Sequence, residues 1–108
     1  MSHGERDSVI TDRDDLLIRR QILDPGEATP WHTDLCHRFT VVVSGDELTI
    51  EFREGVAALV ATVAPGMADW EAPEPRVHRA VNTGTVRFEE VVTFYREHPG
   101  QNPQPEDG

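Results

Sequence analysis

The segment GEATPWHTDLCHRFTVVVSG, residues 26–45, joins a cluster of polar side chains to a strand-forming run between two glycines. His32, Asp34 and Arg38 lie close together, and four β-branched residues follow at 40–43. His32 and Asp34 are two positions apart, so on a strand their side chains point to the same face. An imidazole and a carboxylate are both good ligands for divalent transition metals. The segment therefore predicts strands that carry a candidate metal site.

Strand signals continue along most of the chain. Residues 47–52 alternate cleanly, with Leu48, Ile50 and Phe52 on one face. Turn-forming Gly, Pro, Asn and Asp residues separate such runs at intervals of roughly 8 to 12 residues. The remaining runs lie at 16–23, 39–44, 56–63, 68–72, 77–81 and 87–96. About eight short strands with this spacing are typical of an all-β sandwich or barrel.

The domain organisation follows from length and composition. A chain of 108 residues suits one compact domain. Residues 1–15 and 97–108 are polar, charged or rich in Pro and Gly, which predicts a flexible N-terminal extension and a disordered C-terminal tail. The barrel is then expected at 16–96. Because a core of this size buries only a limited apolar surface, pairing with a second copy would stabilise it. We therefore expect a homodimer.

Composition excludes several classes of function. The net charge of −10 repels phosphate backbones, so nucleic acid is not an expected partner. All ten basic residues are arginine, which excludes Schiff-base catalysis by lysine, and the single Cys36 excludes an internal disulfide. The sequence has no apolar run long enough to span a bilayer and no signal peptide. We therefore expect a cytoplasmic protein with no membrane partner.

Two segments resemble the two sequence motifs of the cupin superfamily. The first family motif reads G(X)5HXH(X)3,4E(X)6G, and residues 26–45 match its glycines, its first histidine and its gaps, with Asp34 and Arg38 at the second histidine and the glutamate. The second motif reads PXG(X)2H(X)3N, and residues 73–82 match it except at Pro75. The resemblance covers residues 16–96. It implies a single small cupin barrel, an all-β double-stranded β-helix or jelly roll.

The resemblance also implies a metal site with a divergent ligand set. Family members bind a divalent metal inside the barrel, and His32 and His78 match two of the ligand positions. Asp34 replaces an imidazole with a carboxylate, whereas Arg38 cannot bind a metal because its guanidinium stays protonated. Two imidazoles and one carboxylate form the composition of the facial triad of non-haem iron enzymes. His37 is a further candidate ligand if the loop is shifted by one residue. The expected cofactor is a divalent ion of Fe, Mn, Ni or Zn.

Two residues are candidates for catalysis. The fork of donors on Arg38 suits the carboxylate of a small anionic substrate. Glu90 shares a face with three apolar residues of the last predicted strand, and is a candidate acid or base. The family resemblance implies oxygenase-type or isomerase-type chemistry, and Arg38 indicates that the substrate is a small anionic molecule.

Structural interpretations stand beside these functional ones. His78 is also compatible with a core histidine, His37 with a solvated loop residue and Glu90 with a structural role. The chain would then be a metal-free module that binds a small ligand, or a structural barrel plugged by an Asp34–Arg38 pair. Metal content separates the enzyme from both alternatives, and a cavity separates the binding module from the plugged barrel.

Overall fold

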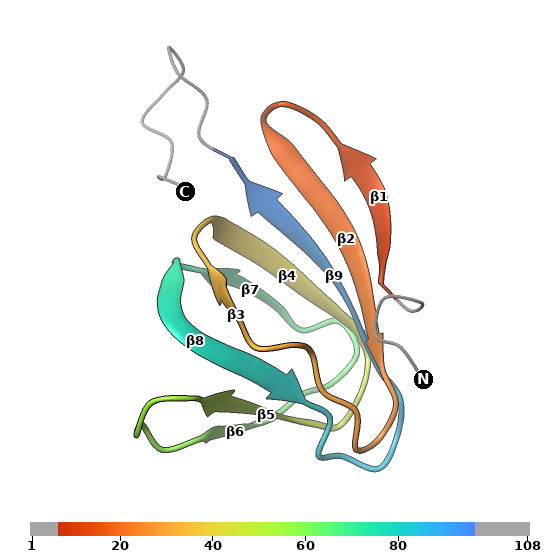
Figure 1. Cartoon of the computed structure of the whole chain (residues 1–108). Helices are drawn as coiled ribbons and strands as arrows, with labels where there is room; N and C mark the ends of the chain where they lie inside the picture. The colour runs from red at the N-terminus through yellow and green to blue at the C-terminus, as the bar shows by residue number, and fades with distance from the viewer. Residues whose placement is uncertain (1–6, 97–108) are drawn as a thin grey trace.

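The computed structural model describes residues 7–96, which form β-strands joined by loops (Figure 1). The strands are β1 (Ser8–Asp12), β2 (Leu16–Leu23), β3 (His32–Asp34), β4 (His37–Ser44), β5 (Glu47–Phe52), β6 (Leu59–Thr62), β7 (Ala68–Glu71), β8 (Glu74–Val81) and β9 (Phe88–Tyr95). This part of the chain contains no helix, and hence none that could cross a membrane. The prediction of an all-β fold is confirmed.

The strands form two antiparallel sheets. The larger sheet has the order β1-β2-β9-β4-β7, and the smaller one has the order β3-β8-β5-β6. In Figure 1 the smaller sheet lies in front of the larger one. Buried residues from both sheets meet between them in one apolar cluster, which comprises Leu23, Val42, Ala80 and Phe88. The two sheets therefore enclose a common interior.

The N-terminal boundary differs from the prediction. Residues 8–12 were expected in a flexible extension, but they form β1, which pairs antiparallel with β2. Val9, Ile10 and Thr11 are β-branched, and the edge of β2 supplies unpaired backbone groups for them to bond. Residues 1–6 and the predicted tail at 97–108 lie outside the described residues.

Two residues of the motifs, Gly45 and Asn82, have structural roles. Gly45 has a φ of 136°, and a Cβ at this position would lie 2.8 Å from the Phe88 ring, so glycine is required here. Asn82 is buried, and its amide nitrogen donates to the carbonyl oxygens of Leu23 and Val86, both at 2.9 Å. Asn82 thus ties the end of β2 to the loop before β9.

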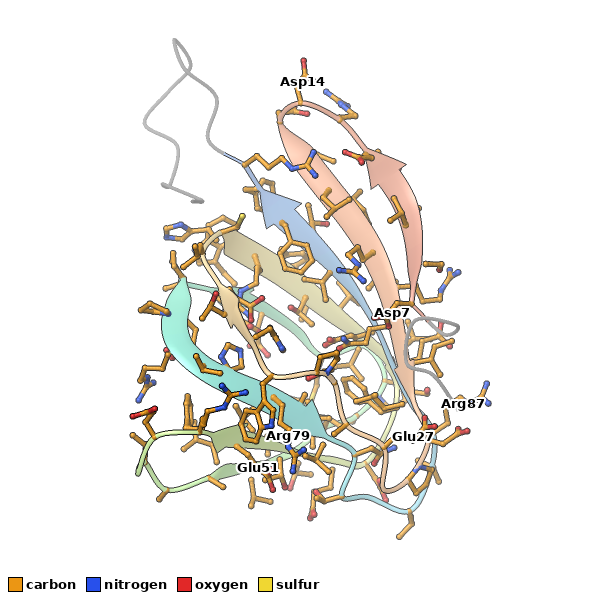
Figure 2. The ribbon with its side chains drawn as sticks, viewed as in Figure 1. Asp7, Asp14, Glu27, Glu51, Arg79 and Arg87 are labelled. Atoms are coloured by element: carbon orange, nitrogen blue, oxygen red, sulfur yellow. The ribbon has the colours of Figure 1, made fainter. Side chains whose placement is uncertain are left out.

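The outer surface of the smaller sheet carries an ion pair between two neighbouring strands. Arg79 on β8 lies directly opposite Glu51 on β5, and their side chains form an ion pair of 2.7 Å. Figure 2 shows these two residues side by side. The Arg79 guanidinium also lies over the Trp31 ring, 4.6 Å from its centroid. These two contacts join the outer side of β8 to β5 and to the loop before β3.

Candidate metal centre

Strand pairing brings two histidines together. β3 pairs with β8 so that His32 lies opposite His78, and their ring centroids are 4.5 Å apart. Asp34 lies two residues after His32 on β3, and its side chain points to the same face of the sheet as that of His32. Its Oδ2 lies 2.8 Å from Nε2 of His78 and 3.4 Å from Nε2 of His32. One ligand atom from each of the three residues therefore lies within 4.8 Å of the other two.

The backbone fixes the orientation of both imidazoles. Nδ1 of His32 lies 2.7 Å from the carbonyl oxygen of Pro30, and Nδ1 of His78 lies 2.7 Å from that of Arg76. A carbonyl oxygen only accepts hydrogen bonds, so each Nδ1 carries a proton and each Nε2 of a neutral ring presents a lone pair. Histidine ligands of metals are commonly oriented in this way.

The three converging atoms are all acceptors, so a cation must sit among them or a proton must be taken up. The hydrogen bond with Asp34 raises the pKa of His32 above its usual value, although burial opposes it. Burial favours a raised pKa for Asp34, but the hydrogen bond from His32 and the charge of Arg38 outweigh it and lower that pKa. In the absence of a metal, Asp34 therefore favours the protonated form of the His32 imidazole. A metal ion would displace that proton.

Arg38 is held firmly beside the cluster. It lies on β4 opposite Glu71 of β7, and its Nη1 is 3.1 Å from both Asp34 Oδ2 and Glu71 Oε1. Its Nη2 donates to the carbonyl oxygen of Ala72 at 2.9 Å. The Asp34–Arg38 pair considered from sequence is therefore present. Glu71 was missed, because only the pairing of β4 with β7 brings it to Arg38.

The pair does not fill the interior. A cavity of about 480 Å³ lies between the sheets, and its lining includes His32, Asp34, His78, Arg38 and Glu90. This volume is within the range of small-molecule sites in proteins. The described residues therefore do not form a barrel whose interior is filled entirely by side chains.

Glu90 faces this cavity from β9, as the alternation of the strand predicts. It lies opposite Gln21 on β2 and Val42 on β4. Burial, together with the charge of Glu71, raises the pKa of Glu90 to about 8, although Arg38 opposes the shift. At neutral pH the carboxyl group is therefore mostly protonated, and it can both donate and accept a hydrogen bond.

His37 is not brought to the cluster, contrary to the expectation of a loop shifted by one residue. The pairing of β4 with β9 is continuous from His37 to Val42, so His37 and Arg38 point to opposite faces. The His37 ring stacks on Trp70 with 5.6 Å between centroids, and Trp70 contacts Tyr95 at 5.3 Å. His37 therefore lies outside the barrel.

Comparisons with known proteins identify the architecture. No family model matches the chain, and no curated protein matches it significantly in sequence. A cupin domain from Bordetella pertussis Tohama I is similar in structure, with a TM-score of 0.74 and 21% identity over 84% of this chain and 92% of that one.

Two further solved structures agree with it. An RmlC-like cupin with a double-stranded β-helix fold from Methanocaldococcus jannaschii has a TM-score of 0.64 and 15% identity, covering 82% of this chain and 79% of that one. A conserved double-stranded β-helix protein from Klebsiella pneumoniae has a TM-score of 0.63 and 23% identity, with 88% and 82% covered. The chain has the cupin fold, a double-stranded β-helix, as its two motifs predict.

Proposed function

We propose that this cupin-fold chain binds a divalent transition-metal ion and acts on a small anionic molecule in its cavity. The ligands would be Nε2 of His32, a carboxylate oxygen of Asp34 and Nε2 of His78. The observation that carries the proposal is the convergence of these three acceptors within 4.8 Å, with both Nδ1 atoms bonded to backbone carbonyls. A metal ion resolves the repulsion among three acceptors.

The ligand set suits the expected ions. Two imidazole nitrogens and one carboxylate oxygen are compatible with Fe, Mn, Ni or Zn. Three protein ligands leave coordination positions open for a small molecule. When bound, such an ion supplies a Lewis acid and, if it is redox-active, an electron donor or acceptor. Oxygenase-type chemistry would use the redox activity of the ion, and isomerase-type chemistry would use its Lewis acidity.

The charges around the cavity favour an anionic ligand once a metal is bound. At neutral pH Glu90 is mostly uncharged, so the formal charges of the other lining residues cancel. The positive residues are Arg19, Arg38 and Arg96, and the negative residues are Asp7, Asp34 and Glu71. A divalent cation would leave the cavity with net positive charge. An anionic molecule would then be attracted to it.

Two side chains have defined parts in this proposal. Arg38 holds the Asp34 carboxylate in place and adds positive charge near the open positions of the site. Glu90 holds a proton at its carboxyl group at neutral pH, and can give it to a substrate oxygen or carbon atom. Glu90 is thus the candidate acid of the reaction, and after losing its proton the candidate base.

A metal-free binding module is the second candidate. The ion pair between Arg38 and Asp34, at 3.1 Å, favours it because Arg38 neutralises the carboxylate without a metal. The proton that Asp34 stabilises on His32 acts in the same direction. In this version the cavity binds an anionic molecule without converting it.

Metal content of the protein purified without a histidine tag separates the two candidates. We expect near-stoichiometric Fe, Mn, Ni or Zn in the natural chain and its loss in Asp34→Ala. Asp24→Ala is the matched control, since Asp24 pairs with Arg87 at 2.9 Å and does not line the cavity. A protein that stays metal-free after incubation with each ion would overturn the metal proposal. Binding of small carboxylates to that protein would then support the second candidate.

A further inference from the structure

Three polar side chains face the cavity from neighbouring strands of the larger sheet. Gln21 on β2 lies directly opposite Glu90 on β9, and Thr40 on β4 lies opposite Val92, two residues further along β9. Gln21, Thr40 and Glu90 all contribute to the cavity lining. Side chains that are opposite or diagonal to one another on paired strands are close enough to contact one ligand. We call these three side chains the polar subsite.

The polar subsite has hydrogen-bonding groups without a protein partner. Among residues 7–96, the structure gives no hydrogen bond to the side chains of Gln21, Thr40 and Glu90, although Thr40 is only 8% exposed. In this part of the chain, the polar side-chain atoms that are both unpartnered and sealed off are Nδ1 of His37 and Nε of Arg38. The polar atoms of the subsite are therefore accessible from the cavity. Because an unpaired buried polar group is costly, their partner must come from within the cavity.

The polar subsite is uncharged at neutral pH. Burial raises the pKa of Glu90 to about 8, so its carboxyl group is mostly protonated. Arg19, two residues before Gln21 on the same face of β2, pairs with Asp7 at 3.3 Å. A carboxamide, a hydroxyl and a protonated carboxyl group each donate and accept hydrogen bonds. The subsite therefore matches an uncharged group that does both better than it matches a second charged group.

The polar subsite and the metal cluster lie at different depths of the cavity. Arg38, which donates to Asp34, lies opposite Phe94 on β9, four residues beyond Glu90. The two rows are roughly 13 Å apart along the backbone, and the long side chains of Arg38 and Glu90 shorten the gap. On the smaller sheet, the lining continues inward from His78 with three apolar residues, Ala80, Ile50 and Leu48. A ligand that reaches both places is therefore polar at its two ends and apolar between them.

We propose that the small anionic ligand of this cavity carries an uncharged hydrogen-bonding group, a carboxamide or a hydroxyl, at the end remote from its carboxylate. Gln21, Thr40 and Glu90 bind that group, while the carboxylate lies at the metal cluster and Arg38. The ligand class is thus the monoamides of short dicarboxylic acids or the matching ω-hydroxy acids. The carboxylate end rests on the proposed function, whereas the uncharged end rests on the polar subsite alone.

The test is the affinity of the full chain for matched probes, measured by isothermal titration calorimetry on samples of known metal content. The probes are the monoamides of succinic, glutaric and adipic acid and ω-hydroxy acids of the same lengths. Each has a counterpart in which an apolar group of similar size replaces the amide or hydroxyl. We expect the best amide or hydroxy probe to bind at least about tenfold more tightly than its apolar counterpart. Comparison of the two series identifies the preferred group.

Substitutions in the polar subsite locate the preference. Thr40→Val and Gln21→Leu remove hydrogen-bonding groups with little change in size, so each is expected to reduce the preference about fivefold. Thr93→Val is the matched control and is expected to keep it. Thr93 lies between Val92 and Phe94, which both line the cavity, so its own side chain points away. The melting temperature of each variant establishes that it is folded.

The outcomes separate this inference from the metal proposal. Equal affinity for polar and apolar probes would overturn the inference, because water would then be the partner of the polar subsite. Binding of none of the probes would overturn it too, as would a preference that survives in both Thr40→Val and Gln21→Leu. A metal-free chain that keeps the preference would support the inference and contradict the metal proposal. A metal-loaded chain without the preference would do the reverse.

Discussion

The inner and outer faces of the larger sheet are made by the same strands but differ in their surroundings. The inner face carries the charged and polar groups of the cavity beside the buried apolar cluster, whereas the outer face carries mainly aromatic and aliphatic side chains. Side chains alternate along a strand, so neighbouring residues of one type occupy the two environments. Arg19 and Arg20 form one such pair and Glu89 and Glu90 another. Outer residues of the same type can therefore serve as controls for inner residues.

The largest difference is expected between the inner and outer histidines. His78→Ala removes one of three ligands, so we expect metal affinity to fall at least about 100-fold, since even loss of a supporting residue costs 10–100-fold. His37→Ala is expected to leave affinity unchanged, because His37 stacks on Trp70 outside the barrel. Competition with a metal-binding dye measures both. Equal losses in the two variants would contradict the assignment of the ligands.

A smaller difference, in the free energy of unfolding, is expected between substitutions of Glu90 and Glu89. The pKa of Glu90 is raised from an ordinary 4.5 to about 8 in the folded state. Between these two pH values the folded chain keeps the Glu90 proton, whereas the unfolded chain has released it. Stability therefore falls as the pH rises from about 4.5 to about 8. Glu90→Gln removes this penalty, so near pH 6 it should be more stable than the natural chain by about 2 kcal/mol, and the advantage should grow as the pH rises further.

The measurement is urea denaturation at several pH values. The advantage of Glu90→Gln should shrink towards zero below about pH 4.5, where both states of the natural chain hold the proton. Glu89→Gln is the control, and it should not gain stability with rising pH because Glu89 pairs with Arg20 on the outside. A Glu90→Gln curve parallel to that of the natural chain would show that Glu90 is ionised in the cavity.

The smallest effect, on metal affinity, is expected for substitutions of Arg38 and Arg20. Arg38 donates to the same Asp34 oxygen that a metal would use, and its charge repels a cation. We expect Arg38→Gln to tighten metal binding about tenfold, or about 1.4 kcal/mol, and Arg20→Gln to leave it unchanged. Titration against a chelator of known affinity measures both. Weaker binding in Arg38→Gln would instead mean that Arg38 orients Asp34 more than it competes with the metal.

Local patterns in the sequence predicted much of this site. Spacing by two residues placed His32 beside Asp34, and alternation along the last strand placed Glu90 inside. The two motifs added His78 and the fold. All of these depend on the period of a strand, which is a property of neighbouring residues.

Contacts across strands were not predictable in the same way. Glu71 meets Arg38 because β7 pairs with β4 in one particular register, and no spacing in the sequence indicates that register. The strand β1 was missed for a related reason, since its polar ends suggested an extension, and only the edge of β2 gives it a partner. The position of His37 depended on whether β4 contains a bulge beside it, which spacing alone does not reveal.

The place of β9 in the larger sheet has a consequence for how the chain acquires its structure during synthesis. β9 is the last strand that the structure describes, yet it lies in the middle of the sheet, between β2 and β4. A nascent chain that has not yet reached Phe88 leaves facing edges of β2 and β4 unpaired. The larger sheet can therefore close only after nearly all of the described chain has left the ribosome, and until then chaperones would have two open strand edges to protect.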